Sequence, residues 1–242
     1  MTLLKGDCLT HMQQMDPESV DHIIVDLPYF QVVKDEFDNQ WKSETEYLDW
    51  VLTVLTEADR LLKPDGNVLL FCSRQCMHNI ASFRQLPWKL QRTIIWARKR
   101  GFNNTRGRAL ASGYEPILHF TKEPGKGTFN NIKIKVDSDR PEYKTGTLKD
   151  GICLSDVWTD IPALPHNSKE KVAHPTQKPL KLMERIVSLY TNEGDVVLDF
   201  CMGSGSTGAA CANLNRKFIG IEKDENYWQI AYERIKTAYE TV

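Results

Sequence analysis

The stretch Val196–Ala210, which reads VVLDFCMGSGSTGAA, combines three features that decide the fold. It starts as a short apolar run typical of a buried strand, passes through a glycine-rich turn, and continues into small residues suited to a helix. Gly203, Gly205 and Gly208 fit the spacing G-x-G-x-x-G. Glycine at the first two positions lets the backbone turn tightly and approach a ligand closely. The stretch therefore predicts a strand–turn–helix unit of a nucleotide-binding α/β sheet.

An acid stands at the end of the next strand. Lys217–Glu222 reads KFIGIE, and Glu222 at its tip occupies the place where a carboxylate binds ribose hydroxyls. We therefore expect a cofactor that contains a nucleoside. NAD fits the fingerprint, which makes an NAD-dependent dehydrogenase one interpretation. However, Asp199 just before the turn would repel a pyrophosphate and attract the ammonium and sulfonium groups of S-adenosylmethionine. The turn also lies only about forty residues from the last residue, which leaves little chain for the other strands of a dinucleotide fold.

The rest of the chain alternates strands with helices, which predicts a doubly wound, mostly parallel α/β sheet in one domain, residues 1–242. The expected strands are His22–Asp26, Asn67–Cys72, Arg92–Ala97, Glu115–Thr121, Asp195–Phe200 and Lys217–Glu222. The expected helices run from a capping box at Ser43 and Glu46 to a stop at Pro64–Gly66, over Pro179–Tyr190, and over Glu225–Tyr239 with Asp224 as N-cap. Residues 122–173 interrupt the alternation and are predicted to be a polar insertion.

The composition excludes several classes of protein. The 242 residues carry 31 Lys and Arg against 32 Asp and Glu, so a nucleic acid would have to be bound by a local basic patch. No apolar run approaches the ~20 residues of a membrane span, and the N-terminus lacks a signal-peptide core. The six cysteines form no C-x-x-C pair, so we expect no metal site. These features together predict a cytoplasmic enzyme with no membrane partner.

A second candidate site is the tetrapeptide Asp26-Leu27-Pro28-Tyr29, which directly follows the first strand. Open α/β sheets bind ligands at the carboxyl ends of their strands. A carboxylate and the Leu27 carbonyl together accept the two N–H groups of an exocyclic amine, and an aromatic ring can stack on a flipped base. An ordinary strand-ending turn is the alternative, which the glycine motif makes less attractive.

Three motifs, in this order, resemble those of the beta class of DNA amino-methyltransferases. They are Asp26–Tyr29, His174–Pro179 (HPTQKP) and Asp199–Thr207, and the similarity runs from about Gly6 to Tyr232. The resemblance implies a Rossmann-like methyltransferase fold in circularly permuted motif order, S-adenosylmethionine as cofactor and double-stranded DNA as substrate. It also implies catalytic roles for Asp26, Leu27, Pro28 and Tyr29. The cofactor-binding residues that we expect are Asp7, His174, Thr176, Gln177, Lys178, Asp199, Phe200, Gly203, Ser204, Gly205, Thr207 and Glu222.

Two departures from the family pattern concern the site itself. Leu27 stands where the family usually has proline, but the expected contact uses the carbonyl, which leucine retains. The family's Asp-Pro-Phe becomes Asp199-Phe200-Cys201, which displaces the aromatic ring expected beside the cofactor.

The target base follows from the resemblance as well. In this family an acid at the first position of the tetrapeptide is associated mainly with adenine N6, so Asp26 favours adenine, and cytosine N4 is the alternative. No proline precedes a cysteine, which disfavours methylation at cytosine C5. Protein and RNA methyltransferases with a similar tetrapeptide usually carry the cofactor motif upstream. A catalytically inactive nucleic-acid-binding module remains a rival from another class.

DNA contact is expected from residues 98–108, which read RKRGFNNTRGR and contain no acid. Phosphates attract such a cluster although the whole chain is nearly neutral, and a solvated surface is the alternative. The candidate contacts are Arg98, Lys99, Arg100, Asn103, Arg106 and Arg108. The insertion 122–173 is the candidate for target recognition. The sequence leaves open a homodimer and a partner restriction endonuclease.

Overall fold

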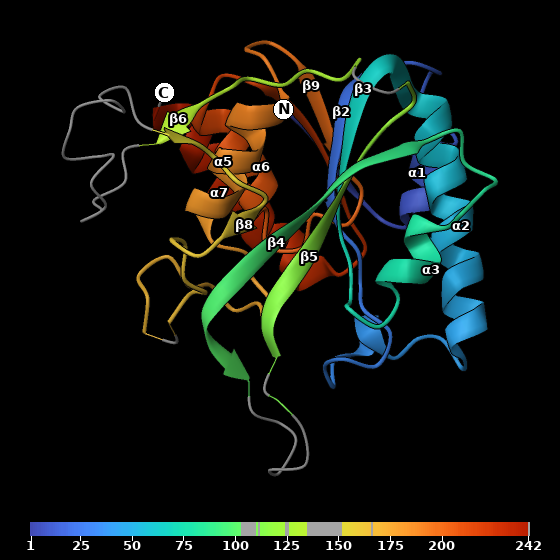
Figure 1. Cartoon of the computed structure of the whole chain (residues 1–242), viewed down its shortest axis with the longest axis horizontal. Helices are drawn as coiled ribbons and strands as arrows, with labels where there is room; N and C mark the ends of the chain where they lie inside the picture. Colours follow the sequence, from blue (N-terminus) through green and yellow to red (C-terminus); the bar gives the residue numbers. More distant parts are fainter. Residues whose placement is uncertain (103–109, 111, 124–125, 135–151, 166, 242) are drawn as a thin grey trace.

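A computed structural model describes residues 1–102, 110, 112–123, 126–134, 152–165 and 167–241. Its centre is an eight-stranded sheet in the order β1-β10-β9-β2-β3-β5-β4-β8, and helices cover both faces of it (Figure 1). The strands are β1 (Thr2–Lys5), β2 (Val20–Asp26), β3 (Leu62–Phe71), β4 (Lys89–Phe102), β5 (Ser112–Thr121), β8 (Val157–Trp158), β9 (Val196–Asp199) and β10 (Lys217–Glu222). The expected α/β class is confirmed.

The first five strands of this order are all parallel. Each of β1, β10, β9, β2 and β3 pairs with its neighbour in the same direction, as strands covered by helices on both faces should. The register places His22 of β2 beside Val197 of β9, and Gly220 of β10 beside Asp199. The carboxyl ends of β2, β9 and β10 therefore lie next to one another at one edge of the sheet. This edge carries the residues singled out in the sequence.

The other side of the sheet is built differently. β5 runs antiparallel to both β3 and β4, and β4 and β5 form a long hairpin that projects beyond the helices (Figure 1). Because β5 runs against β3, the beginning of β5 lies at the same edge as the carboxyl end of β3. Glu115, near the beginning of β5, is thereby brought to the edge that carries Asp26.

Helices divide between the two faces of the sheet. The face with α1 (Cys8–Met12), α2 (Glu44–Leu61) and α3 (Met77–Ala81) packs around Tyr47 and Leu55. The face with α5 (Leu180–Tyr190), α6 (Ser206–Asn213) and α7 (Glu225–Thr241) packs around Ile186 and Ile235. Within the described ranges, no helix is long and apolar enough to cross a membrane.

The boundaries of two predicted helices test the sequence signals at their ends. Ser43 caps α2 as expected, because its hydroxyl accepts the Glu46 N–H at 3.1 Å. Asp224 caps α7 by accepting the Tyr227 N–H at 2.9 Å. The expected end of α2 is wrong, since the helix stops at Leu61 and residues 64–66 already belong to β3.

Part of the predicted insertion forms regular secondary structure. Within 122–173, β6 (Lys133–Ile134) and β7 (Ile152–Cys153) form a two-stranded sheet, and β8 adds to the main sheet beside β4. Trp158 of β8 is buried, and Trp96 donates its indole N–H to the Ile161 carbonyl at 2.7 Å. Trp158 and Trp41 are both buried, so they pack within the protein.

Candidate active site

A cavity of 610 Å³ opens at the carboxyl ends of β1, β10, β9 and β2. Asp26, Leu27 and Pro28 line it from one side, and the turn at Gly203 lines it from the other. Sheet order explains the meeting of these distant segments, because β2 and β9 are neighbours. One pocket therefore serves both the tetrapeptide and the glycine turn, as the two motifs together require.

The two glycines of the turn have different reasons for being glycine. Both adopt the left-handed conformation, with φ of +50° at Gly203 and +76° at Gly205. Gly203 lines the cavity, as expected. A Cβ on Gly205 would instead meet Ile235 at 2.9 Å and Ala231 at 3.0 Å, both on α7. The expectation that Gly205 approaches the ligand is therefore corrected, because its missing side chain makes room for a helix.

Asp199 is buried at the wall of the cavity, with 2% of its surface exposed. Thr207 donates its hydroxyl to Asp199 Oδ2 at 2.6 Å, and the Cys201 N–H reaches Oδ1 at 3.1 Å. Burial raises the pKa of Asp199 to about 7, and these hydrogen bonds oppose the rise. A buried carboxylate with neutral donors only is stabilised in its ionised form by a cationic ligand.

Glu222 both shapes the turn and faces the cavity. Its carboxylate accepts the Gly203 N–H at 2.8 Å and the Asp224 N–H at 2.8 Å. Burial raises the pKa of Glu222 despite these bonds. Each carboxylate oxygen has two lone pairs, so a ligand hydroxyl can still be accepted.

The remaining residues around the turn lie at the same cavity. Asp7 lines it while its carboxylate caps α1 through the Thr10 N–H at 3.0 Å. Ser204 and Phe200 also line the cavity, and the Phe200 ring is buried in the core below α2. Phe200 thus belongs both to the core and to the lining of the cavity.

The HPTQKP segment contributes in several ways. Thr176 lines the cavity, and His174 packs there between Phe37 and Tyr227, with ring centroids 6.1 and 4.4 Å away. Burial lowers the pKa of His174 to about 4, so the ring is neutral at physiological pH. Gln177 lines the cavity too, but its amide bonds within its own segment, to the Val172 N–H at 2.8 Å and the Glu170 carbonyl at 2.9 Å.

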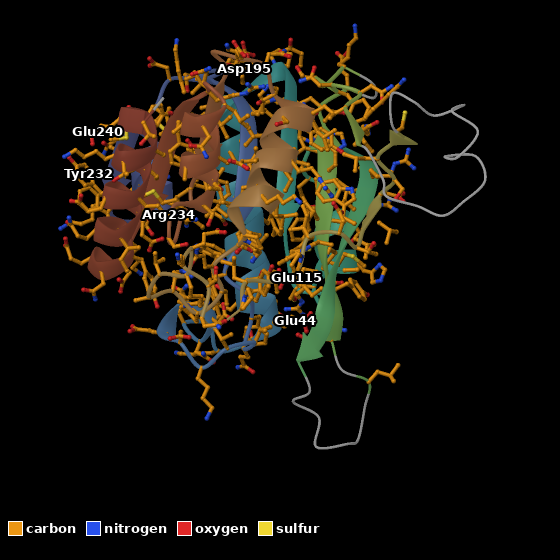
Figure 2. All side chains as sticks on the ribbon, turned by 90° about the vertical axis from the view of Figure 1, so that its left-hand side faces the viewer. Glu44, Glu115, Asp195, Tyr232, Arg234 and Glu240 are labelled. Carbon is orange, nitrogen blue, oxygen red and sulfur yellow. The ribbon has the colours of Figure 1, made fainter. Side chains whose placement is uncertain are left out.

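Arg234 of α7 ties this segment to the glycine turn. Its guanidinium donates to the Ser206 hydroxyl at 2.9 Å and to Glu170 at 3.2 Å. Figure 2 labels Arg234 on α7. The α7 helix therefore supports the residues on both sides of the HPTQKP segment, Glu170 and Ser206.

Lys178 lies where the sequence did not place it. Its ammonium contacts Asp26 Oδ2 at 2.5 Å and Glu115 at 3.3 Å. Lys178 lines the cavity, yet its charged end is directed to the tetrapeptide rather than to the turn. The ammonium of Lys178 is thus paired with the catalytic candidate Asp26, and the expected contact with the cofactor stays a prediction.

The tetrapeptide is held by a carboxylate that sequence reasoning missed. Asp38 is buried and accepts the backbone N–H groups of Tyr29 at 2.6 Å and Val33 at 3.0 Å. Burial raises the pKa of Asp38 to about 6. The Tyr29 hydroxyl donates to Asp26 Oδ1 at 3.0 Å. No local sequence signal identifies Asp38, because its role depends on how the loop after β2 folds back.

The basic segment is only partly within the described residues. Arg98 does not face outward: its guanidinium bonds to Glu115 at 2.9 Å and to the Ser112 hydroxyl at 3.0 Å. The expectation that Arg98 is available to phosphates is therefore corrected. The backbone at Lys99 and Arg100 continues β4, whereas Asn103, Arg106 and Arg108 lie outside the described residues.

Two cysteines, Cys72 and Cys76, are buried free thiols. Among the described ranges, no group of three or more His, Cys, Asp or Glu could hold a metal ion. The side chains that line the cavity include carboxylates, hydroxyls, aromatic rings and two lysines, Lys178 and Lys223.

Comparisons with known proteins agree on one family. The sequence model described as DNA methylase, N6_N4_Mtase, matches residues 20–233. The chain is 32% identical to the type II methyltransferase M.HpaI of Haemophilus parainfluenzae, across 98% of this chain and 74% of that protein. It is also 32% identical to the DNA adenine methyltransferase YhdJ of Escherichia coli (strain K12), across 98% of this chain and 83% of that protein.

Solved structures have the same fold. The complex of M1.HpyAVI with SAM superposes with a TM-score of 0.70 at 29% identity, covering 97% of this chain and 98% of that one. The PvuII DNA methyltransferase, which is cytosine-N4-specific, gives a TM-score of 0.73 at 19% identity over 98% and 90% of the two chains. The latter likeness concerns the fold alone.

Proposed function

The chain belongs to the N6_N4_Mtase family of DNA methylases, and from that premise we propose that it methylates the exocyclic N6 of adenine in DNA. One observation carries the proposal: Asp26 and Gly203 line the same cavity. A carboxylate suited to an amine thus faces a turn suited to a nucleoside cofactor. Family membership supports this function over the NAD-dependent dehydrogenase and over an inactive binding module.

The cofactor is S-adenosylmethionine, the ligand named in the complex of the similar M1.HpyAVI. The cavity suits it, because 610 Å³ is a usual size for a small-molecule site and two buried carboxylates face its interior. We assign Asp199 to the cationic part of the cofactor and Glu222 to its ribose hydroxyls. When bound, S-adenosylmethionine supplies an electrophilic methyl group on a sulfonium.

The tetrapeptide prepares the amine of the base. That amine is a weak nucleophile, because its lone pair is delocalised into the ring. The Asp26 carboxylate and the Leu27 carbonyl accept its two N–H groups and favour a pyramidal nitrogen with a free lone pair. Asp26 then takes the proton that the nitrogen loses, and Tyr29 stacks on the flipped base.

Adenine is the finer part of the proposal. Asp26 supports it, because an acid at this position is associated mainly with adenine in the family that the tetrapeptide resembles. The name of the adenine methyltransferase relative supports it as well. Cytosine N4 is the alternative, since the family includes both chemistries.

The test is nucleoside analysis of plasmid DNA from a host without DNA methyltransferases that expresses this chain. We expect N6-methyladenine, and sequencing of modified positions would give the recognition sequence. N4-methylcytosine without N6-methyladenine would overturn the choice of base. The variant Asp26→Ala, expressed at the same level, is the control for methylation by the host.

We further propose that DNA is contacted by the basic segment from Lys99 to Arg108 and by the insertion 122–173, both carried by one catalytic domain of residues 1–242. Attraction of phosphates to local cations supports the first, and position beside the β4–β5 hairpin supports the second. A homodimer, a partner restriction endonuclease and a cytoplasmic location stay predictions.

A further inference from the structure

Lys178 lies deep in the protein with two carboxylates as neighbours. Only 6% of its side chain is exposed. Its ammonium is 2.5 Å from Asp26 and 3.3 Å from Glu115. The rings of Phe71 and Tyr29 stand 5.2 and 5.6 Å from the same nitrogen. Each of these four neighbours therefore favours or tolerates positive charge.

The neighbours keep Lys178 charged. Burial alone disfavours an ammonium, but the charges of Asp26 and Glu115 more than offset this and raise the pKa of Lys178. Glu115 is itself paired with Arg98 at 2.9 Å. The four side chains alternate in sign from Arg98 on β4, through Glu115 on β5 and Lys178 of the HPTQKP segment, to Asp26 at the end of β2. Such alternation makes a buried charge row neutral overall.

We propose that Lys178 and Glu115 are positioning residues that set the charge and orientation of the Asp26 carboxylate, rather than parts of the cofactor site. This inference rests on the proposed function, because it assumes that Asp26 acts on the amine. Lys178 occupies one carboxylate oxygen and the Tyr29 hydroxyl the other. These two bonds fix the plane of the carboxylate, and each oxygen retains a lone pair for an incoming N–H.

The groups that face Asp26 determine how it titrates. Burial raises its pKa most strongly, the Lys178 charge lowers it, the Glu115 charge raises it, and the hydrogen bonds from Lys178 and Tyr29 lower it. The further titratable groups near Asp26 are Asp38, Asp199 and Cys72, each of which is electrostatically linked to it. Lys178 is therefore the positive charge that opposes several carboxylates and the buried surroundings.

The two positioning residues should move Asp26 in opposite directions. Without the Lys178 charge, the pKa of Asp26 rises, and the active carboxylate forms only at higher pH. Without the Glu115 charge, Lys178 interacts with Asp26 alone, and the pKa of Asp26 falls. A merely structural role would lower activity in both variants without opposite displacements of the pH profile.

The experiment measures single-turnover methyl transfer against pH at saturating cofactor for Lys178→Met and Glu115→Gln. We expect the acid limb of Lys178→Met to move up by about 1–3 pH units, the usual effect of one adjacent charge. We expect that of Glu115→Gln to move down by about 1 unit or less. Lys178→Arg keeps the charge and should leave the limb near its original position.

Two controls distinguish a positioning role for Lys178 from a role in binding the cofactor. Lys181→Met removes the same charge from an exposed position on α5 and should leave the profile unchanged. Cofactor affinity, measured by calorimetry, should change less than about threefold in Lys178→Met, because no cofactor contact is lost. A large loss of affinity with an unmoved pH profile would return Lys178 to the cofactor site and overturn the inference.

Further outcomes are equally decisive. Limbs that move in the same direction in the two variants would overturn the inference, while the proposed function would stand as long as Asp26→Ala remains inactive. Should Lys178→Met fail to fold, as judged by circular dichroism, the downward shift of Glu115→Gln tests the same claim by itself. Full activity of Asp26→Ala would instead remove the proposed function.

Discussion

The two sides of the cavity satisfy their carboxylates in different ways. On the glycine-turn side, Asp199 and Glu222 accept only hydrogen bonds from backbone N–H groups and one hydroxyl, all from residues within 19 positions in the chain. On the tetrapeptide side, Asp26 is bonded to a lysine that lies 152 positions away. Within the described ranges, neither Asp199 nor Glu222 takes part in an ion pair.

This difference matches the charges of the two ligands, a cationic cofactor on one side and a neutral amine on the other. Carboxylates that have neutral donors keep their full attraction for a cationic cofactor. A carboxylate beside a lysine is largely neutralised, so it attracts a neutral amine through hydrogen bonds without competing for the sulfonium. The contrast teaches that one cavity can hold two kinds of carboxylate. One kind accepts hydrogen bonds from neutral donors, and the other is paired with a lysine.

The variant with the largest expected effect is Asp26→Ala, which alters the tetrapeptide side alone. The variant removes the acceptor for the amine and for its proton, so we expect a loss of turnover of about 10³-fold or more. Cofactor affinity should stay within about threefold, because the glycine-turn side is intact. Turnover is measured with tritiated cofactor and mixed DNA, and affinity by calorimetry. Undiminished turnover would contradict the assignment of roles to the two sides.

A second variant, Gly205→Val, destabilises the glycine-turn side of the cavity. Gly205→Val forces a branched residue into the left-handed region and against Ala231 and Ile235, so we expect at least about 2 kcal/mol of lost stability. Cofactor affinity should fall as a consequence of the displaced turn. The matched control is Gly113→Val, since a Cβ at Gly113 meets nothing within 4 Å and valine suits a strand. Equal denaturant midpoints for the two variants would show that packing against α7 does not require glycine.

The variant Glu222→Ala should weaken the binding of the cofactor without affecting the tetrapeptide side. The turn loses the acceptor of the Gly203 N–H, and the ribose loses its carboxylate, so we expect affinity to fall by about 10- to 100-fold. The rate at saturating cofactor should change little. Glu233→Ala on the exposed face of α7 is the charge-matched control and should bind normally. A reduced saturated rate with normal affinity would exchange the roles of the two sides.

The smallest expected effect concerns pH. The pKa of Asp199 is about 7, because burial raises it, and a cationic ligand binds the ionised form. Cofactor affinity should therefore increase about tenfold between pH 6 and pH 8, as the carboxylate loses its proton before binding. Calorimetry at several pH values measures this. Asp199→Asn should flatten the dependence, and an equally steep slope in that variant would assign it to the ligand's own groups.

Local signals predicted the parts of the site that are built from neighbouring residues. The strand Lys217–Glu222, the turn at Gly203, and the capping of α2 by Ser43 were all confirmed, because a few adjacent residues suffice to specify them. The short strand β1 and the helix α1 escaped detection. Four residues of β1 are too few for a periodic pattern, and β1 is defined by pairing with β10.

Sequence patterns and motifs did not predict the contacts between residues that are far apart in the chain. The position of Lys178 in HPTQKP suggested the cofactor, whereas the folded chain directs its ammonium to Asp26. Arg98 looked like a phosphate ligand in a basic run, yet it faces Glu115. Each of these two side chains is directed toward a carboxylate that offsets the cost of burying its charge. That carboxylate belongs to a different segment of the sequence.

The amino-acid sequence by itself determined the α/β class, the family and the two motifs that line the cavity, since hydrophobic period, turn chemistry and motif spacing are local properties. Tertiary structure decided which carboxylate receives a cation, why Gly205 is glycine, and that Glu115 and Asp38 belong to the site. The physical reason is the order of the strands. Placing β2 beside β9, and β5 antiparallel beside β3, brings together charges whose pairing no single segment encodes.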